Sequence, residues 1–348
     1  MPWATDGIII SSSTAFQSQM ALRIGCSGWS YDDWIGPFYP KDVKKEDWLA
    51  YYGHFFPTVE INSTFYAVPN PYTVQSWVQK GNSVRKFRED RFYSQDKDQA
   101  TFSYSLKLPQ KITHEHLVKG EVEKATRDLK VFGTAVLNPL YEQDLIGAVL
   151  VQMSPYFRFE PDDEKETKVL EVLEDFLQVL PTDKYDWALE LRHKSWLTKG
   201  KGKTMTLVPE AAALIRKFNV MLCETDGPGF PDLRSPGAKK VYVRFHGHNQ
   251  DLWFKKGAGS SKGMENKKNS AAEAPDPKGR YNRYDYLYTE EELKPWKTHL
   301  EEDIEDRYIY FNNHPRGKGP KNALMLMDLL SVKHEAKEIK ISSQERLF

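Results

Sequence analysis

Polar and charged residues recur at two-residue spacing near the ends of several apolar segments. Glu60 and Asn62 have this spacing in one segment, and Glu190 and Arg192 have it in another. Residues two apart point to the same face of a β-strand, and the alternating neighbours here are mostly apolar. Other segments contribute polar residues at matching places, namely Ser105 and Lys107, Gln152, Arg244 and His246, and Asn312. Such a set can transfer protons and bind a charged substrate.

The charged members of this set lean cationic, because three basic side chains stand against two carboxylates. Arginine binds phosphates and carboxylates through paired hydrogen bonds, so the set predicts an anionic ligand. The candidate acids and bases are Glu190, Glu60 and His246, and the candidate substrate-binding residues are Asn62, Lys107, Gln152, Arg192, Arg244 and Asn312.

Two other interpretations of these residues remain open. Glu190 with Arg192, or Glu60 with Arg244, would also make plain ion pairs that plug a barrel without any ligand. A metal site is the second alternative, but no spaced histidine pair occurs and the neighbouring arginines would repel a cation, so it is not favoured. The residues that would supply such a metal site are His114, His193, His246, Glu60, Glu190, Glu224 and Asp226.

Aromatic residues cluster just after the candidate strands, as Trp29, Tyr66 and Trp196 illustrate. Flat aromatic faces stack on sugars and nucleobases, which makes these three candidates for substrate stacking. The alternative is that they pack the loops together. A second weak signal is the glycine-rich basic segment 314–321, which precedes a helical pattern. It is either an anion site at a helix N-terminus or a flexible basic turn.

The elements that would position these residues alternate along the chain. Short apolar runs are separated by segments with helical periodicity, which predicts parallel strands joined by helices. Eight such units predict a single (β/α)8 TIM-type barrel. Residues 227–238 carry too much proline and glycine for a helix, so the sixth crossover helix is expected to be missing. The expected strands are 22–29, 59–66, 101–109, 146–155, 186–193, 220–226, 239–247 and 307–313.

Composition sets the limits of this interpretation. The 348 residues carry 49 basic and 49 acidic side chains, which argues against a strongly electrostatic binder of nucleic acid. Two cysteines provide no disulfide framework, and no apolar run reaches the length of a membrane span, so we expect a cytoplasmic protein. The barrel is expected over 21–333, with insertions at 82–100 and 255–283, a disordered extension at 1–20 and a polar tail at 334–348.

The same segments resemble domain-of-unknown-function family 72, the YecE-like proteins, a family with no assigned reaction. The resemblance spans residues 22–330 in unchanged order and implies a β/α barrel. Departures are Ser154, where proline is usual, and the two insertions. The matching blocks are 23–29, 38–40, 59–66, 112–114 with Lys107, 152–155, 190–196, 242–247 and 310–313.

Three hypotheses for function follow from these observations. The first is an enzyme that acts on a phosphorylated or nucleotide-like substrate by acid–base chemistry, with phosphoester hydrolysis as one version. The second is a sugar isomerase, lyase or hydrolase that uses Glu60 and Glu190 as a pair. The third is a non-catalytic module that binds a metabolite or nucleic acid, with the basic stretch 255–268 as a contact. No organic cofactor motif is present, so the cofactor remains unknown.

Overall fold

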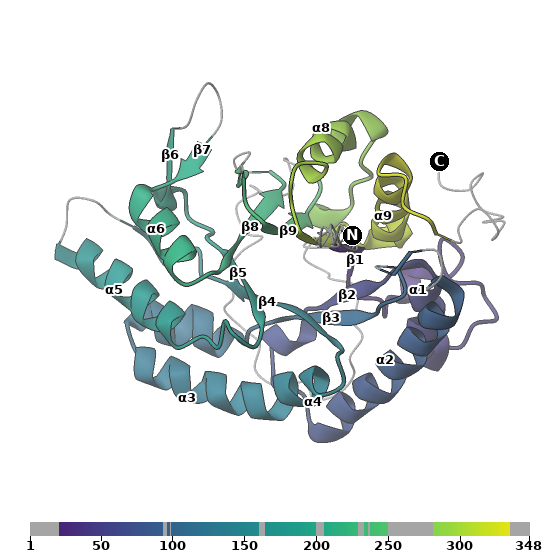
Figure 1. The fold of residues 1–348 in the computed structure, drawn as a ribbon, viewed down its shortest axis with the longest axis horizontal. Helices are drawn as coiled ribbons and strands as arrows, with labels where there is room; N and C mark the ends of the chain where they lie inside the picture. Colours follow the sequence, from purple (N-terminus) through teal and green to yellow (C-terminus); the bar gives the residue numbers. More distant parts are fainter. Residues whose placement is uncertain are drawn as a thin grey trace, which may run out of the picture.

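The chain forms a closed barrel of eight parallel strands surrounded by helices in a computed structural model (Figure 1). The structure describes residues 21–92, 96–97, 99–159, 164–199, 205–228, 233–235, 237–249 and 281–334. The expected TIM-type barrel is therefore confirmed. Its strands are β1 (Ala21–Ser27), β2 (Thr58–Ile61), β3 (Ser103–Lys107), β4 (Ile146–Gln152), β5 (Asp186–Glu190), β8 (Met221–Asp226), β9 (Lys240–Phe245) and β10 (Asp306–Phe311).

Each expected strand is present, but most end earlier than the apolar runs do. Asn62, Arg192, His246 and Asn312 all lie just beyond the last residue of their strands. The chain leaves β2, for example, through a turn of 3-10 helix over Ser63–Phe65. These side chains therefore stand on the loops above the barrel, where ligands bind in this fold.

Helices occupy most of the connections between strands, and they form the outer ring visible in Figure 1. Between β8 and β9, the described residues contain no helix, as the dense proline and glycine predicted. A two-stranded hairpin of β6 (Leu197–Lys199) and β7 (Met205–Leu207) follows β5. The helices are α1 (Trp48–Phe55), α2 (Pro71–Phe92), α3 (Val122–Phe132), α4 (Asn138–Tyr141), α5 (Glu164–Gln178), α6 (Pro209–Lys217), α8 (Glu290–Leu300) and α9 (Lys318–Leu329).

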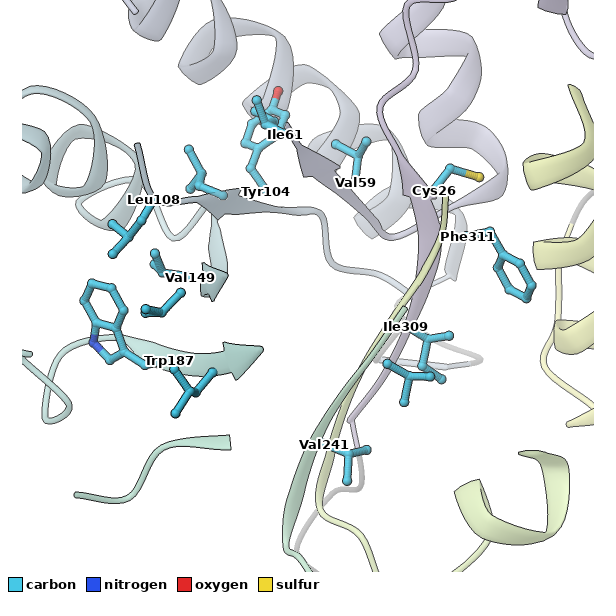
Figure 2. Packing of buried hydrophobic residues seen from close by; sticks show 14 of the residues in the cluster. Cys26, Val59, Ile61, Tyr104, Leu108, Val149, Trp187, Val241, Ile309 and Phe311 are labelled. Atoms are coloured by element: carbon cyan, nitrogen blue, oxygen red, sulfur yellow. The ribbon is translucent and has the colours of Figure 1, made fainter. Parts of the chain in front are cut away.

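Two hydrophobic layers hold the barrel together. The larger one lies between strands and helices, and Figure 2 shows part of it, including Val59, Val149 and Ile309. The smaller one fills the lumen and contains Tyr242 and Tyr310. Buried tyrosines need a hydrogen-bond partner. The Tyr242 hydroxyl donates to Glu60 at 2.6 Å and the Tyr310 hydroxyl donates to Ser105 at 2.7 Å, so polar side chains lie within the same lumen.

The first half of the predicted insertion at 82–100 is helical, since α2 continues without interruption to Phe92. The apolar period is masked because Arg88 occupies a buried position of the stripe between Val84 and Phe92. Its guanidinium donates to the carbonyl oxygens of Gly53 and Gln99, at 2.7 and 2.8 Å. A charged residue thus fills a core position, because backbone carbonyls and the Gln99 side chain accept hydrogen bonds from its guanidinium.

The expected extension at 1–20, the insertion at 255–283 and the tail beyond residue 334 lie outside the described residues. Among the helices that the structure describes, none is both long enough and apolar enough to cross a membrane.

Replacing Arg88 with alanine should lower the free energy of unfolding by about 2–3 kcal/mol, because several buried carbonyl oxygens lose their donor. The matched control is Lys86→Ala on the exposed face of α2, where a much smaller loss is expected. Urea denaturation of both variants measures the difference. Equal stabilities would show that Arg88 does not join α2 to its neighbours.

Candidate functional site

A cavity of about 140 Å³ opens at the C-terminal ends of the barrel strands. Its wall is mostly polar, which distinguishes it from the apolar layers around it. The volume suits a small ligand. The lining residues are Tyr31, Asn62, Tyr66, Lys107, Gln152, Glu190, Arg192, Arg244, His246, Tyr284, Asn312 and His314.

The floor of this cavity is an ionic cluster in which Arg244 joins two carboxylates. Its Nε and Nη2 donate to both oxygens of Glu60, at 3.0 and 2.9 Å, and its Nη1 donates to Glu190 at 2.9 Å. Arg244 comes from β9, Glu60 from β2 and Glu190 from β5, so the cluster crosses the lumen. All three side chains are at most 2% exposed.

The remaining lone pairs of the two carboxylates are also occupied. Ser27 and Tyr242 each donate a hydroxyl to Glu60 at 2.6 Å. The Gln152 amide donates to both oxygens of Glu190, at 2.8 and 3.0 Å. Fully satisfied networks of this kind fix their members in place.

The cluster keeps both carboxyl groups ionised. Burial alone would raise the pKa of Glu60 and Glu190, but the Arg244 guanidinium holds the pKa of each below its ordinary value. A general acid at neutral pH needs a raised carboxyl pKa. Neither glutamate meets that requirement here.

Lys107 is a buried titratable group in the cavity lining. It ends β3, and its side chain is 8% exposed. Burial, together with the positive charges of Arg244 and Arg192, lowers the pKa of Lys107 to about 7. Its Nζ lies 3.7 Å from the centre of the Phe65 ring. Within the described part of the chain, that Nζ makes no hydrogen bond and no ion pair.

The histidines of the cavity are neutral at physiological pH. Burial, reinforced by Arg244 and Arg192, places the pKa of His246 well below its ordinary value. Its Nδ1 lies 3.0 Å from the Asn312 amide nitrogen, which assigns the ring proton to Nε2. Burial lowers the pKa of His314 to about 4, and this ring stacks on Tyr31 at 4.6 Å.

Two polar atoms in the cavity wall point to a bound group. Arg192 is 27% exposed, and its Nε approaches Glu190 only to 3.7 Å, beyond hydrogen-bonding distance. That Nε and the Asn62 Oδ1 are buried without a hydrogen-bond partner among the described residues. Buried polar groups are normally paired, so a ligand that accepts from Arg192 and donates to Asn62 fits this wall.

The structure gathers most of the predicted site residues around one cavity, and it leaves three outside the lining. Glu60 lies beneath the floor rather than in the lining. Trp196 is fully buried against Phe157 and Phe159 and donates its indole N–H to the Phe157 carbonyl at 2.8 Å. Trp29 is half-buried and is absent from the lining. The structure therefore places both tryptophans in the packing of the loops.

Three lining residues were missed as site residues, namely Tyr31, Tyr284 and His314. Tyr31 carried a signal, because it belongs to the aromatic group after the first strand. His314 follows Asn312 at the two-residue spacing used elsewhere, although the chain has left β10 by then. Tyr284 lies far from any predicted strand, and only the tertiary structure brings it to the cavity.

The other candidate sites have structural partners. In the basic segment 314–321, Arg316 and Lys318 both pair with Asp285. The metal candidates Glu224 and Asp226 bond outward, to His299 at 2.8 Å and to the Trp296 indole at 2.8 Å respectively. Among the residues described, no three histidine, cysteine, aspartate or glutamate side chains gather as a metal site would require.

The family model described as "Protein of unknown function DUF72" matches residues 23–346. The chain belongs to this family. The curated UPF0759 protein YunF of Bacillus subtilis (strain 168) is 26% identical over 90% of this chain and 96% of its own length. A crystal structure of a DUF72 family protein from Thermotoga maritima MSB8 is 27% identical, with a TM-score of 0.61, over 89% of this chain and 99% of that one.

A second DUF72 family crystal structure, from Enterococcus faecalis V583, has 19% identity and a TM-score of 0.63 over 90% of this chain and 96% of that one. These similarities agree with the barrel described above. The names of these three relatives assign no reaction, so the function is argued from the cavity itself.

Replacing Arg244 with methionine should destabilise the protein by about 3–5 kcal/mol at pH 7, because two buried carboxylates lose their counter-ion. Without Arg244, burial should raise both carboxyl pKa values above those of the unfolded chain. Stability of the variant should then increase as pH falls from 7 to 5, whereas the wild type gains nothing from these groups over that range. Denaturation at both pH values measures this; a constant difference would contradict it.

Proposed function

We propose that this protein is an enzyme that acts on a small anionic substrate at the C-terminal face of the barrel. Lys107 and Arg192 would bind the anionic group, and Lys107 and His246 would carry protons. The observation that carries this proposal is Lys107, a buried amine whose pKa of about 7 lets it accept or donate a proton at neutral pH.

The charge balance supports an anionic ligand. Three basic side chains meet only two carboxylates around the cavity, and Arg244 already neutralises much of their charge. Among the described residues, Lys107 faces the cavity without an ion pair, and Arg192 approaches its nearest carboxylate, Glu190, only to 3.7 Å. Burial lowers the pKa of His114 to about 4, and the positive charges of Lys107 and Arg192 add to this effect. An anion bound here would relieve that excess charge.

The state of Glu60 and Glu190 favours a role in holding Arg244. It argues against sugar chemistry that uses the two carboxyl groups as a catalytic pair. A retaining or inverting glycosidase needs one carboxyl group with a raised pKa and another free to attack or to activate water. Here both are ionised and both are held by Arg244. Glu60 and Glu190 therefore fix Arg244, and the proton-carrying roles pass to Lys107 and His246.

An enzyme also accounts for Lys107 better than a binding module does. A site that only binds an anion is strongest when its lysine stays fully charged, as a paired or solvated amine does. A near-neutral amine weakens simple anion binding and favours proton transfer or nucleophilic attack. The basic stretch 255–268, the proposed nucleic-acid contact, lies outside the described residues.

Sulfate should raise the melting temperature of the wild-type protein, since an anion that binds only the folded state stabilises it. Arg192→Met should weaken this binding at least about tenfold, because its guanidinium supplies a charge-assisted hydrogen bond. Lys111→Met is the matched control, since Lys111 is 59% exposed and pairs with Asp128 outside the cavity. A thermal-melt titration that gives both variants the wild-type sulfate response would contradict the anion site.

Sulfate binding should also take up protons at pH 7.5. A bound anion raises the pKa of Lys107, so a partly neutral amine becomes protonated on binding. At pH 6 the amine is already charged, and the uptake should fall toward zero. The charged groups that face Lys107 are Arg244, Glu190, Arg192 and Glu60, with His114 nearby. Calorimetry in two buffers of different ionisation enthalpy measures the uptake, which Lys107→Met should abolish.

A further inference from the structure

The position of Lys107 is fixed more firmly than lysine side chains usually are. Its backbone belongs to β3 and pairs with Leu150 of β4. The Thr64 hydroxyl donates to its carbonyl oxygen at 2.6 Å, which ties the end of β3 to the loop that follows β2. The same loop carries Phe65, whose ring faces the Lys107 amine. The amine is therefore held at the cavity wall with little conformational freedom to lose on reaction.

Its surroundings contrast with those of the paired lysines in the same fold. Lys240 lies 2.8 Å from Asp186, and despite partial burial that contact raises the pKa of Lys240 above its ordinary value. The Lys107 amine instead faces the Phe65 ring. An aromatic ring compensates only weakly for the hydration that a buried ammonium group loses. The charges neighbouring Lys107 are the Arg244 and Arg192 guanidiniums and the two carboxylates that Arg244 already binds. Desolvation beside another cation is how enzymes generate nucleophilic lysines.

We propose that Lys107 is a nucleophile whose substrates are small anionic aldehydes or ketones, with which its Nζ forms an imine. This inference rests on the proposed function, because it takes the same cavity and the same anion-binding residue, Arg192. It adds the class of substrate and a covalent step.

The step balances with one proton taken up from solvent and no other reactant. The neutral Nζ attacks the carbonyl carbon, a C–N bond forms and the π electron pair of the C=O bond moves to oxygen. A proton transferred from nitrogen to that oxygen gives a carbinolamine. Protonation of the hydroxyl lets it leave as water while the nitrogen lone pair forms the iminium. The iminium can then accept an electron pair from a bond broken at the adjacent carbon.

The neighbouring residues suit this chemistry. His246 is a neutral imidazole in the cavity lining, so it can pass the proton that the carbinolamine needs. Arg192 would hold the carboxylate or phosphate of the substrate. The Asn62 Oδ1, buried without a hydrogen-bond partner in the described structure, accepts a bond from a substrate hydroxyl or from water.

The test is reductive trapping on the full-length protein. Pyruvate or dihydroxyacetone phosphate is added with cyanoborohydride at pH 7, where hydride adds to an iminium and leaves a stable secondary amine. Intact mass and peptide mapping then locate the adduct. A neutral fraction on the order of a thousandfold above that of an ordinary lysine should direct labelling to Lys107 at least about tenfold faster than to exposed lysines.

Variants make the labelling site unambiguous. Lys107→Met should remove the fast adduct, whereas Lys111→Met should retain it. Lys107→Arg keeps a cation in the cavity and forms no imine, so it should still bind sulfate. If the Lys107 variants do not fold, mapping on the wild-type protein still decides, because it measures labelling at Lys107 directly.

Acetone and sulfate separate this inference from the proposed function. Fast labelling by pyruvate, slow labelling by uncharged acetone and protection by sulfate support both. Sulfate binding that depends on Arg192, with no faster labelling of Lys107 by either anionic probe, overturns the imine and leaves the anion site. Fast labelling that is equal for acetone and pyruvate, with no sulfate response, keeps the nucleophile and overturns the anionic substrate.

Discussion

The ionic contact of Arg244 with Glu60 and Glu190 is the constraint on which the upper half of the barrel depends. Three strands that are not neighbours in the sheet, β2, β5 and β9, each send one charged side chain into the lumen. Burial of these charges is tolerable only because they meet in hydrogen-bonding geometry. The tyrosine layer below supplies a further donor from Tyr242, so the apolar and ionic layers are joined.

This contact also determines which residues are left for chemistry. Each carboxylate is committed to Arg244, so neither is available as a general acid. Burial, reinforced by the positive charge that remains in excess around the cavity, keeps His246 neutral and Lys107 close to neutrality. The chemical character of the site thus follows from the balance of charges around it more than from the residue types alone.

Near the same site, side-chain contacts compensate for the helix that is missing from the described part of the ring. The described residues contain no helix between β8 and β9, so β8 needs another connection to the outer layer. Asp226, its last residue, accepts hydrogen bonds from the Tyr288 hydroxyl and the Trp296 indole, both at 2.8 Å. Trp296 belongs to α8, and the Phe245 ring packs against it. Polar contacts from a strand end thereby replace part of the missing helical packing.

The sequence by itself determined the barrel and most of the residues that line its cavity. Alternation of side chains along a strand is a local property, so Glu190, Arg244 and the residues two positions beyond them could be assigned to one face without knowledge of contacts. The failures also have local causes. Arg88 concealed the last turns of α2, because a buried arginine breaks the apolar period. Trp196 does not face the cavity because its ring stacks on Phe157 and Phe159 instead.

Only the tertiary structure decided which charges pair. Arg192 is close to Glu190 in the sequence, yet Arg244, which is 54 residues from Glu190 and 184 from Glu60, makes the close contacts. Pairing across the lumen depends on barrel closure and register, which set distances between strands that sequence spacing does not encode. The same reason explains Lys107. Its pKa of about 7 arises from burial and from charges on β9 and beyond β5, and no local pattern shows it.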